Sequence, residues 1–264
     1  MTALVWDQVG DRRYEVGVDH GVLYLSDLSG VAWNGLTAVD EKLADDSKPF
    51  YLDGVKYLDA EVLSDFSATL KAITYPDEFE QFDGIGAYGN GLFVHDQRAK
   101  RFGLSYRTRI GNDLAGVDLG YKIHILYNLT AVPDTRDYVS LTATPGLIAF
   151  GWKLVGTPEG TPGYRPTAHI VIDSTEIDPN FLKSLKDILY GTATAAPRLP
   201  SAQELVTLAK EWVRITITDN GDGTWTATGH DRLFTMSNPT TFEITEADAI
   251  YSDANTYTIS STEF

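Results

Sequence analysis

The stretch Phe102-Gly-Leu104-Ser-Tyr106-Arg-Thr108-Arg-Ile110 decides the fold class of this chain. Its even positions are mostly apolar, and Arg107 and Arg109 share the opposite face. This period of two is typical of a half-buried β-strand, because successive side chains of a strand point to opposite sides of the sheet. We therefore predict a strand here, with one face in the core and two arginines on the other.

The same alternation recurs on both sides of this stretch. Residues that alternate, or that form short apolar runs bounded by turn residues, predict further strands. These strand candidates are residues 16–25, 66–72, 121–127, 147–155 and 168–172.

Two turn sequences predict β-hairpins. Residues 213–218 alternate, run into Asp219-Asn-Gly-Asp-Gly223 and return as residues 224–228. Asn-Gly and Asp-Gly favour the positive φ angles that tight hairpin turns require. Asp53-Gly54 predicts a second hairpin in the same way.

Two short helices interrupt the strands. Asp178 can cap the first, near 178–190, which opens with Pro179 and ends at Gly191. Ser201 and Glu204 form a capping box that starts the second, near 201–212.

The layer rule for such a pattern predicts a mainly β fold, a β-sandwich or open barrel with two short flanking helices. We expect residues 1–210 to form this core, and the acidic hairpin region 211–264 to be an appendage to it.

Composition excludes several classes of protein. The 264 residues include no cysteine, which excludes disulfide scaffolds, thiolate metal sites and cysteine nucleophiles. The apolar runs are much shorter than the 18 or more residues that a membrane-spanning helix needs. The N-terminus has neither the basic start nor the apolar stretch of a signal peptide, so we expect folding in the cytoplasm and no membrane partner.

Charge is unevenly distributed along the chain. The formal net charge is −16, and residues 1–97 carry 18 acidic and 6 basic residues, a net charge of −12. Residues 98–210 are mildly basic, with 13 basic and 10 acidic residues. Such a chain should not adhere to nucleic acid, because phosphate neutralisation supplies most non-specific binding. Two interpretations of the net charge stay open: it serves solubility alone, or it keeps DNA from adhering to a surface that the DNA passes.

The sequence supplies no catalytic signature, so we expect neither an enzyme nor a cofactor or metal site. Gly-x-Ser-x-Gly and His-Glu-x-x-His motifs are absent. Residues 84–89 match Gly-x-Gly-x-x-Gly, but they lack the preceding strand and following helix of a dinucleotide site, which favours a flexible glycine loop. His124 and His169 lie inside predicted strands and are interpreted as ordinary core or surface histidines.

Residues 75–101 predict a long irregular loop, which in a compact domain usually has a function. Its first half is acidic and its end is basic, which suits a head-to-tail contact between copies of the chain. Arg107 and Arg109 could likewise meet carboxylates of a neighbouring copy. The candidate intersubunit residues are Asp77, Glu78, Glu80, Asp83, Arg98, Lys100, Arg101, Arg107 and Arg109.

Several segments in order resemble the major tail proteins, or tail tube proteins, of long-tailed, non-contractile bacteriophages, particularly those that infect actinobacteria. The segments that carry the resemblance are residues 13–24, 31–36, 51–57, 72–79, 104–113, 120–128, 166–174, 188–191 and 219–229.

The resemblance implies a structural virion protein. It implies a β-sandwich core with a flanking helix, assembled as hexameric rings that stack into a tube, and assembly in the host cytoplasm into the virion tail. Implied partners are further copies of the chain, the tape-measure, tail-terminator and distal tail proteins, and DNA in transient passage. If the tube lumen is acidic, Asp59, Glu61 and Asp65 are the candidate residues that line it.

Two alternatives remain open at this point. One is a minor or distal tail protein, or a carbohydrate-binding β-sandwich that takes part in host recognition; the 5 Trp and 14 Tyr allow it. The other is a β-rich hydrolase, which the missing motifs disfavour.

Overall fold

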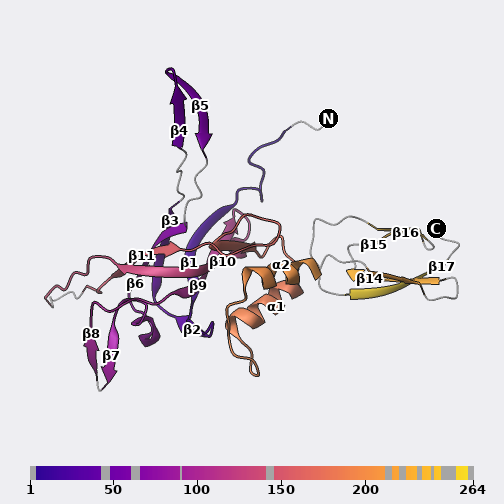
Figure 1. Ribbon diagram of the computed structural model, residues 1–264. Coiled ribbons are helices and arrows are strands. Elements are labelled where there is room, and N and C mark those ends of the chain that lie inside the picture. Colours follow the sequence, from indigo (N-terminus) through magenta and orange to yellow (C-terminus); the bar gives the residue numbers. More distant parts are fainter. Residues whose placement is uncertain are drawn as a thin grey trace.

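An antiparallel sheet of eight strands forms the body of the molecule (Figure 1). Seven strands follow the order β2-β1-β9-β10-β11-β6-β3, and β12 pairs with β10. The strands are β1 (Tyr14–Tyr24), β2 (Gly30–Trp33), β3 (Leu36–Lys42), β6 (Phe66–Ala72), β9 (Phe102–Asn112), β10 (Gly116–Pro133), β11 (Phe150–Gly156) and β12 (His169–Asp173). The mainly β fold with two short helices, predicted from the sequence, is confirmed.

The computed structural model describes most of the chain, and for the C-terminal strands it describes the course of the backbone. The described residues are 4–42, 48–60, 66–89, 91–140, 146–211, 216–219, 224–230, 234–238, 241–244 and 254–260.

The sheet curls until its two edges meet. β2 ends at Trp33 and β3 begins at Leu36, although these strands stand at opposite ends of the strand order. Only Asn34 and Gly35 lie between them. Gly35 has a φ of 79°, a backbone conformation that glycine adopts readily, and its carbonyl accepts a hydrogen bond from the Ile73 N–H at 2.9 Å. A single curled sheet forms the body, so the open barrel describes it better than a two-sheet sandwich.

The inner face of the curled sheet encloses an aromatic core. Trp152 of β11 and Phe79 are fully buried, with ring centroids 5.0 Å apart and nearly perpendicular planes. The ring centroids of Trp33 and Phe79 lie 4.5 Å apart. Phe79 ends the short 3-10 helix η1 (Asp77–Phe79), which therefore inserts an aromatic ring into the barrel. Edge-to-face contacts of this kind are favoured between aromatic rings.

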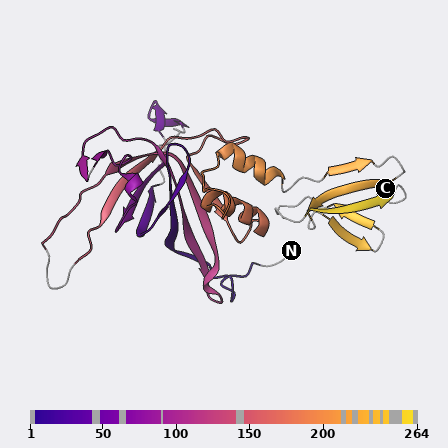
Figure 2. The ribbon, with the colours of Figure 1, turned by 90° about the horizontal axis from the view of Figure 1, so that it is seen from below.

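Two helices cover part of the outer face of the sheet, α1 (Pro179–Tyr190) and α2 (Ala202–Glu211) (Figure 2). Leu185 and Leu189 of α1 are fully buried in a second core with Ile123 and Ile125 of β10. The Tyr24 hydroxyl of β1 donates a hydrogen bond to the Leu189 carbonyl at 3.0 Å, which ties the helix end to the sheet. Ile123, Ile125 and Tyr127 of β10 thus face the helices, whereas Leu126 faces the barrel core. After a register shift in the pairing of β10 with β9, the odd positions Leu129 and Ala131 face the barrel core instead.

The helix ends largely follow the sequence signals. The Asp178 carboxylate accepts a hydrogen bond from the Phe181 N–H at 3.1 Å, and Ser201 Oγ accepts one from the Glu204 N–H at 3.1 Å. The Glu204 carboxylate also binds the Arg198 guanidinium, at 2.8 Å from its Nη1. The Arg198 hydrogen bond, with a smaller contribution from the Ser201 backbone, lowers the pKa of Glu204.

Both predicted hairpins form. β4 (Lys48–Leu52) pairs with β5 (Val55–Ala60), and the turn residues Asp53 and Gly54 have φ angles of 49° and 78°, as a type I′ turn requires. β13 (Thr216–Asp219) pairs with β14 (Thr224–His230).

The C-terminal strands pair among themselves. β13 and β14 form a three-stranded sheet with β17 (Ala254–Ser260), and β15 (Phe234–Asn238) pairs with β16 (Thr241–Ile244). That residues 211–264 are an appendage to the core stays a prediction.

The irregular loop predicted for residues 75–101 is more ordered than its sequence suggests. After η1, β7 (Gly86–Gly89) and β8 (Leu92–Val94) form a hairpin in place of the expected flexible glycine loop. The base of this segment is closed, because the Gln97 N–H donates to the Gly84 carbonyl at 2.9 Å. Gly84 has a φ of 73°, and a Cβ there would lie 3.0 Å from the Gln97 carbonyl oxygen, so the close approach requires glycine.

Candidate functional site

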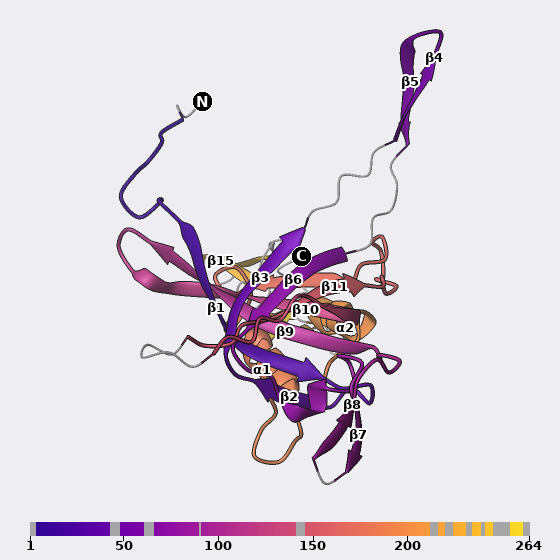
Figure 3. The same cartoon turned by 90° about the vertical axis from the view of Figure 1, so that its left-hand side faces the viewer.

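The β4–β5 hairpin, here called the hairpin arm (residues 48–60), stands away from the body in Figures 1 and 3. Most of its large side chains are apolar and exposed; Tyr57, for example, is 70% exposed. A lone two-stranded hairpin is marginally stable in water, and exposed apolar clusters usually mark interaction sites. The exposed apolar residues of the arm are Phe50, Tyr51, Leu52, Val55, Tyr57 and Leu58.

An N-terminal arm (residues 4–9) projects in the same general direction as the hairpin arm (Figures 1 and 3). It too is apolar, and Trp6 is 74% exposed beside the exposed Leu4, Val5 and Val9. Its base is held by Asn112, whose Nδ2 donates to the Gly10 carbonyl at 3.0 Å.

The β7–β8 hairpin, here called the lower hairpin, points the opposite way in both views. It exposes Tyr88, Leu92, Phe93 and Val94, and Tyr88 is 83% exposed. Apolar projections therefore lie at two opposite poles of the body. In the sequence this segment is distinguished by its charges, and its exposed apolar residues appear only in the structure.

The charged ends of the same segment lie close to its closed base. Asp77 and Glu78 are exposed, Glu80 is half-buried, and Arg98 and Arg101 are exposed. The Lys100 ammonium donates to Gln81 Oε1 at 2.9 Å, which joins the basic end to the acidic end. The Lys100 N–H also donates to the Gln81 carbonyl at 3.2 Å, so the acidic and basic ends of the segment lie close together. A contact of this segment with a neighbouring copy stays a prediction.

Asp83 is not a surface residue. It is buried, it pairs with the Arg136 guanidinium, and it accepts a hydrogen bond from Trp152 Nε1 at 2.7 Å. A buried carboxylate needs such partners, since an unpaired buried charge is costly. Asp83 therefore holds the aromatic core together and is not available for a contact between copies.

Arg107 and Arg109 lie side by side on β9, as predicted, but they already have a partner. The Asp19 carboxylate of β1 accepts hydrogen bonds from Arg107 Nε at 2.8 Å and from Arg109 Nε at 3.1 Å. Partial burial would raise the pKa of Asp19, but the two arginines outweigh burial and lower it to about 2. The carboxylate that we expected on a neighbouring copy is supplied by the same chain.

The candidate lumen acids are only partly within the described residues. Asp59 lies in β5 of the hairpin arm. Glu61 and Asp65 lie outside the described residues. The acidic lumen therefore stays a prediction.

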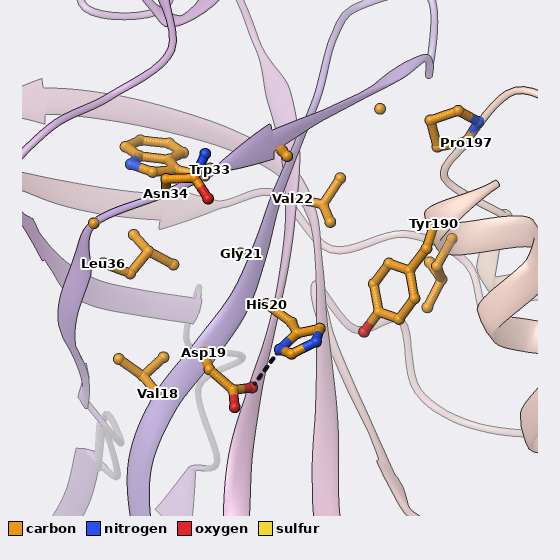
Figure 4. Close-up of a pocket in the computed structure, with 14 residues that line it drawn as sticks. Val18, Asp19, His20, Gly21, Val22, Trp33, Asn34, Leu36, Tyr190 and Pro197 are labelled. Carbon is orange, nitrogen blue, oxygen red and sulfur yellow. Dashed lines mark ion pairs between the residues drawn. The ribbon is translucent and has the colours of Figure 1, made fainter.

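A groove of about 560 Å³ lies between β1, the β2–β3 connection and the end of α1 (Figure 4). Its walls are mostly apolar, and its polar groups include an ion pair of His20 Nδ1 with Asp19 at 3.0 Å. His20 has a φ of 50° at a bulge of β1, which turns its ring toward Tyr190 at 6.2 Å between ring centroids. Serine, threonine and cysteine are absent among the lining residues, so the groove provides an Asp–His pair without one of these nucleophiles.

His124 and His169, which the sequence predicts to be ordinary histidines of separate strands, come together with Glu41, which no sequence pattern indicates. The Nδ1 of His124 lies 3.1 Å from the Nε2 of His169. The three residues are far apart in the sequence and follow no motif spacing, so only the curled sheet reveals the cluster.

No helix in the described part of the chain is long and apolar enough to cross a membrane.

The chain has distant structural similarity to components of injection systems. No family model matches the sequence, and no curated protein matches it significantly. One similar solved structure is a chain of the sheath–tube complex of an extracellular contractile injection system, PVC, in the extended state, with 16% identity over 58% of this chain and 88% of that chain and a TM-score of 0.31. Another is a chain of the 6-fold symmetrised baseplate of the anti-feeding prophage (AFP), with 10% identity over 65% of this chain and 97% of that chain and a TM-score of 0.29.

Proposed function

We propose that this chain is a structural subunit of a phage tail tube, which assembles with copies of itself into stacked, hexameric rings that conduct DNA. The observation that carries the proposal is the pair of opposite poles, each with exposed apolar projections. The resemblance of the sequence to major tail proteins supports it independently. In this role the chain is a non-enzymatic virion protein that is assembled in the host cytoplasm and contacts tape-measure, tail-terminator and distal tail proteins.

The placement of the projections favours a head-to-tail assembly. The hairpin arm and the N-terminal arm point one way, and the lower hairpin points the other way (Figures 1 and 3). When two different surfaces of a subunit bind each other, the contact repeats at every step and produces a ring or an open stack. Burial of apolar surface stabilises an association by about 25 cal/mol per Å². Contacts between these apolar projections can therefore drive the assembly of copies.

The proposal is tested with a variant of the hairpin arm. We expect Tyr51→Ser together with Tyr57→Ser to prevent the formation of rings and tubes, because both aromatic side chains are exposed in the monomer. Negative-stain microscopy and sedimentation velocity of the purified chain measure this outcome. Circular dichroism checks that the barrel stays folded.

The matched control is Tyr138→Ser together with Tyr164→Ser, which removes two equally exposed tyrosines outside the projections. The control should assemble as the unaltered chain does. Assembly of the arm variant at the normal concentration would contradict the proposal, and so would an unaltered chain that stays monomeric at high concentration with tail initiators present.

The same exposed aromatic residues favour one second candidate, a distal tail or carbohydrate-binding protein. Tyr51, Tyr57 and Tyr88 offer the ring faces on which sugars stack. Monodisperse monomers that bind glycans, with binding lost in the arm variant, would support this second function over the tube.

A further inference from the structure

Three potential metal ligands meet at the inner face of the barrel, and each comes from a different strand. Glu41 lies near the end of β3, His124 lies in β10, and His169 begins β12. β3 pairs with β6 at one end of the strand order, whereas β10 and β12 pair with each other in the opposite wall. The curl of the sheet therefore brings the Glu41 carboxylate across the barrel to the two imidazoles.

The spacing of the ligand atoms suits a tetrahedral metal. Zinc binds imidazole nitrogen and carboxylate oxygen at about 2.0–2.2 Å, so two ligand atoms on one tetrahedral ion lie about 3.4 Å apart. His124 Nδ1 lies 3.1 Å from His169 Nε2 and 3.2 Å from Glu41 Oε1. One ligand atom from each residue lies within 4.8 Å of the others. Small side-chain adjustments are enough to place all three around one ion.

Neighbouring groups orient the three ligands. Thr108 Oγ1 lies 3.1 Å from His124 Nε2, so this nitrogen can carry the proton while Nδ1 keeps its lone pair for a metal. The Tyr106 hydroxyl donates a hydrogen bond to Glu41 Oε1, and the Tyr106 ring stacks on His124 with centroids 4.6 Å apart. Hydrogen-bonded outer partners of this kind are typical of protein metal sites.

The cluster is sheltered but accessible. The side chains of His124 and His169 are 10% and 17% exposed, and that of Glu41 is 29% exposed, which leaves one side open for an ion to enter.

We propose that Glu41, His124 and His169 bind one zinc ion inside the barrel. Two imidazoles and one carboxylate are a common zinc ligand set. The ion would join β3 to β10 and β12, so its binding stabilises the curled sheet. Glu41 also directly precedes the segment that leads to the hairpin arm, and the ion would hold the end of that strand in place.

The experiment is a titration of the chelator-treated full chain with zinc chloride in a calorimeter. We expect one zinc ion per chain and a midpoint of thermal unfolding that rises with zinc concentration. Cobalt(II) in place of zinc should give the visible absorption bands of a tetrahedral site. His169→Ala should weaken zinc binding more than about 100-fold, beyond the loss usual for an outer partner.

Two further variants keep the test decisive. Glu41→Gln preserves the side-chain shape and an oxygen that can accept the Tyr106 hydrogen bond, so it should fold while it loses zinc affinity. His95→Ala removes an exposed histidine outside the cluster and should bind zinc normally. The proposal would be overturned if the unaltered chain did not bind one zinc ion per chain. It would also be overturned if His169→Ala and Glu41→Gln each bound zinc as tightly as the unaltered chain does.

Discussion

At the scale of single residues, Asp19 pairs with both arginines that the sequence offers for a contact between copies. Arg107 and Arg109 point to the same side of β9, and Asp19 of the neighbouring strand accepts hydrogen bonds from both. The Arg107 guanidinium also lies 4.5 Å from the centre of the Tyr121 ring, a cation–π contact. The ion pairs of Asp19 with Arg107 and Arg109 exist only when the Asp19 carboxylate is ionised, so the stability of this part of the sheet depends on pH.

We expect Asp19→Asn to lower the free energy of unfolding at pH 7, because it removes the ion pairs with Arg107 and Arg109. The loss should be about 1 kcal/mol, since solvent screens charges at a partly exposed site. The folded pKa of Asp19 is about 2, below its ordinary value of 3.8. The ionised form therefore stabilises the fold above about pH 4, and this contribution is lost as the pH falls toward 2. Urea unfolding at pH 7 and at pH 2.5 measures both effects.

The variant and the unaltered chain should approach equal stability at the lower pH. Asp118→Asn is the control, because the Asp118 side chain is 82% exposed and lies 3.6 Å from Arg109. An Asp118→Asn loss as large as that of Asp19→Asn would show that the loss does not come from the pairing of Asp19 with the two arginines.

At the scale of elements, the end of α1 depends on one glycine. Gly191 has a φ of 77° and follows Tyr190 directly, in the left-handed conformation that ends many helices. A Cβ at this position would lie 2.8 Å from the Ala195 carbonyl oxygen and 2.9 Å from the Pro197 ring. The helix end and the following connection therefore pack too closely for any side chain.

We expect Gly191→Ala to destabilise the chain by more than about 1 kcal/mol, because both the backbone conformation and the space oppose a side chain. The midpoint of thermal unfolding measures the loss. Gly160→Ala is the matched control, since a Cβ there meets nothing within 4 Å. A Gly191→Ala variant as stable as this control would contradict the expectation.

At the scale of the whole molecule, the net charge of −16 has to be reconciled with self-assembly. Copies of an acidic chain repel each other, so basic groups near the lower hairpin are candidates for contact with acidic surfaces of a neighbour. Isolated exposed ion pairs contribute at most about 1 kcal/mol, but a closed ring repeats each pair. Arg98, Lys100 and Arg101 lie at the base of this hairpin and remain our candidates for that contact.

We therefore predict that Arg98→Glu, Lys100→Glu and Arg101→Glu together block tube growth while the circular dichroism spectrum stays unchanged. Pelleting and microscopy at low and high salt measure the outcome.

The control for this triple variant changes the net charge equally at other sites. Lys153→Glu, Lys183→Glu and Lys186→Glu together should still assemble, because these residues lie outside the segment 75–101. Normal polymerisation of the first triple variant at both salt concentrations would show that these basic residues are ordinary surface charges.

Local patterns in the sequence were sufficient to predict individual strands and turns. The alternation in residues 66–72 and 102–110 predicts β6 and most of β9, and Asp53-Gly54 predicts the turn of the hairpin arm. These features depend on neighbouring residues: side chains alternate along a strand, and a tight turn needs particular φ angles.

Only the tertiary structure decided which distant residues meet. Arg107 paired with Asp19 instead of a neighbouring copy, and Asp83 became part of the aromatic core. Glu41 and His124, 83 positions apart, came together across the barrel. The physical reason is that strand order and sheet curl depend on the packing of the whole core. The alternation of apolar residues along one strand contains no information about that packing.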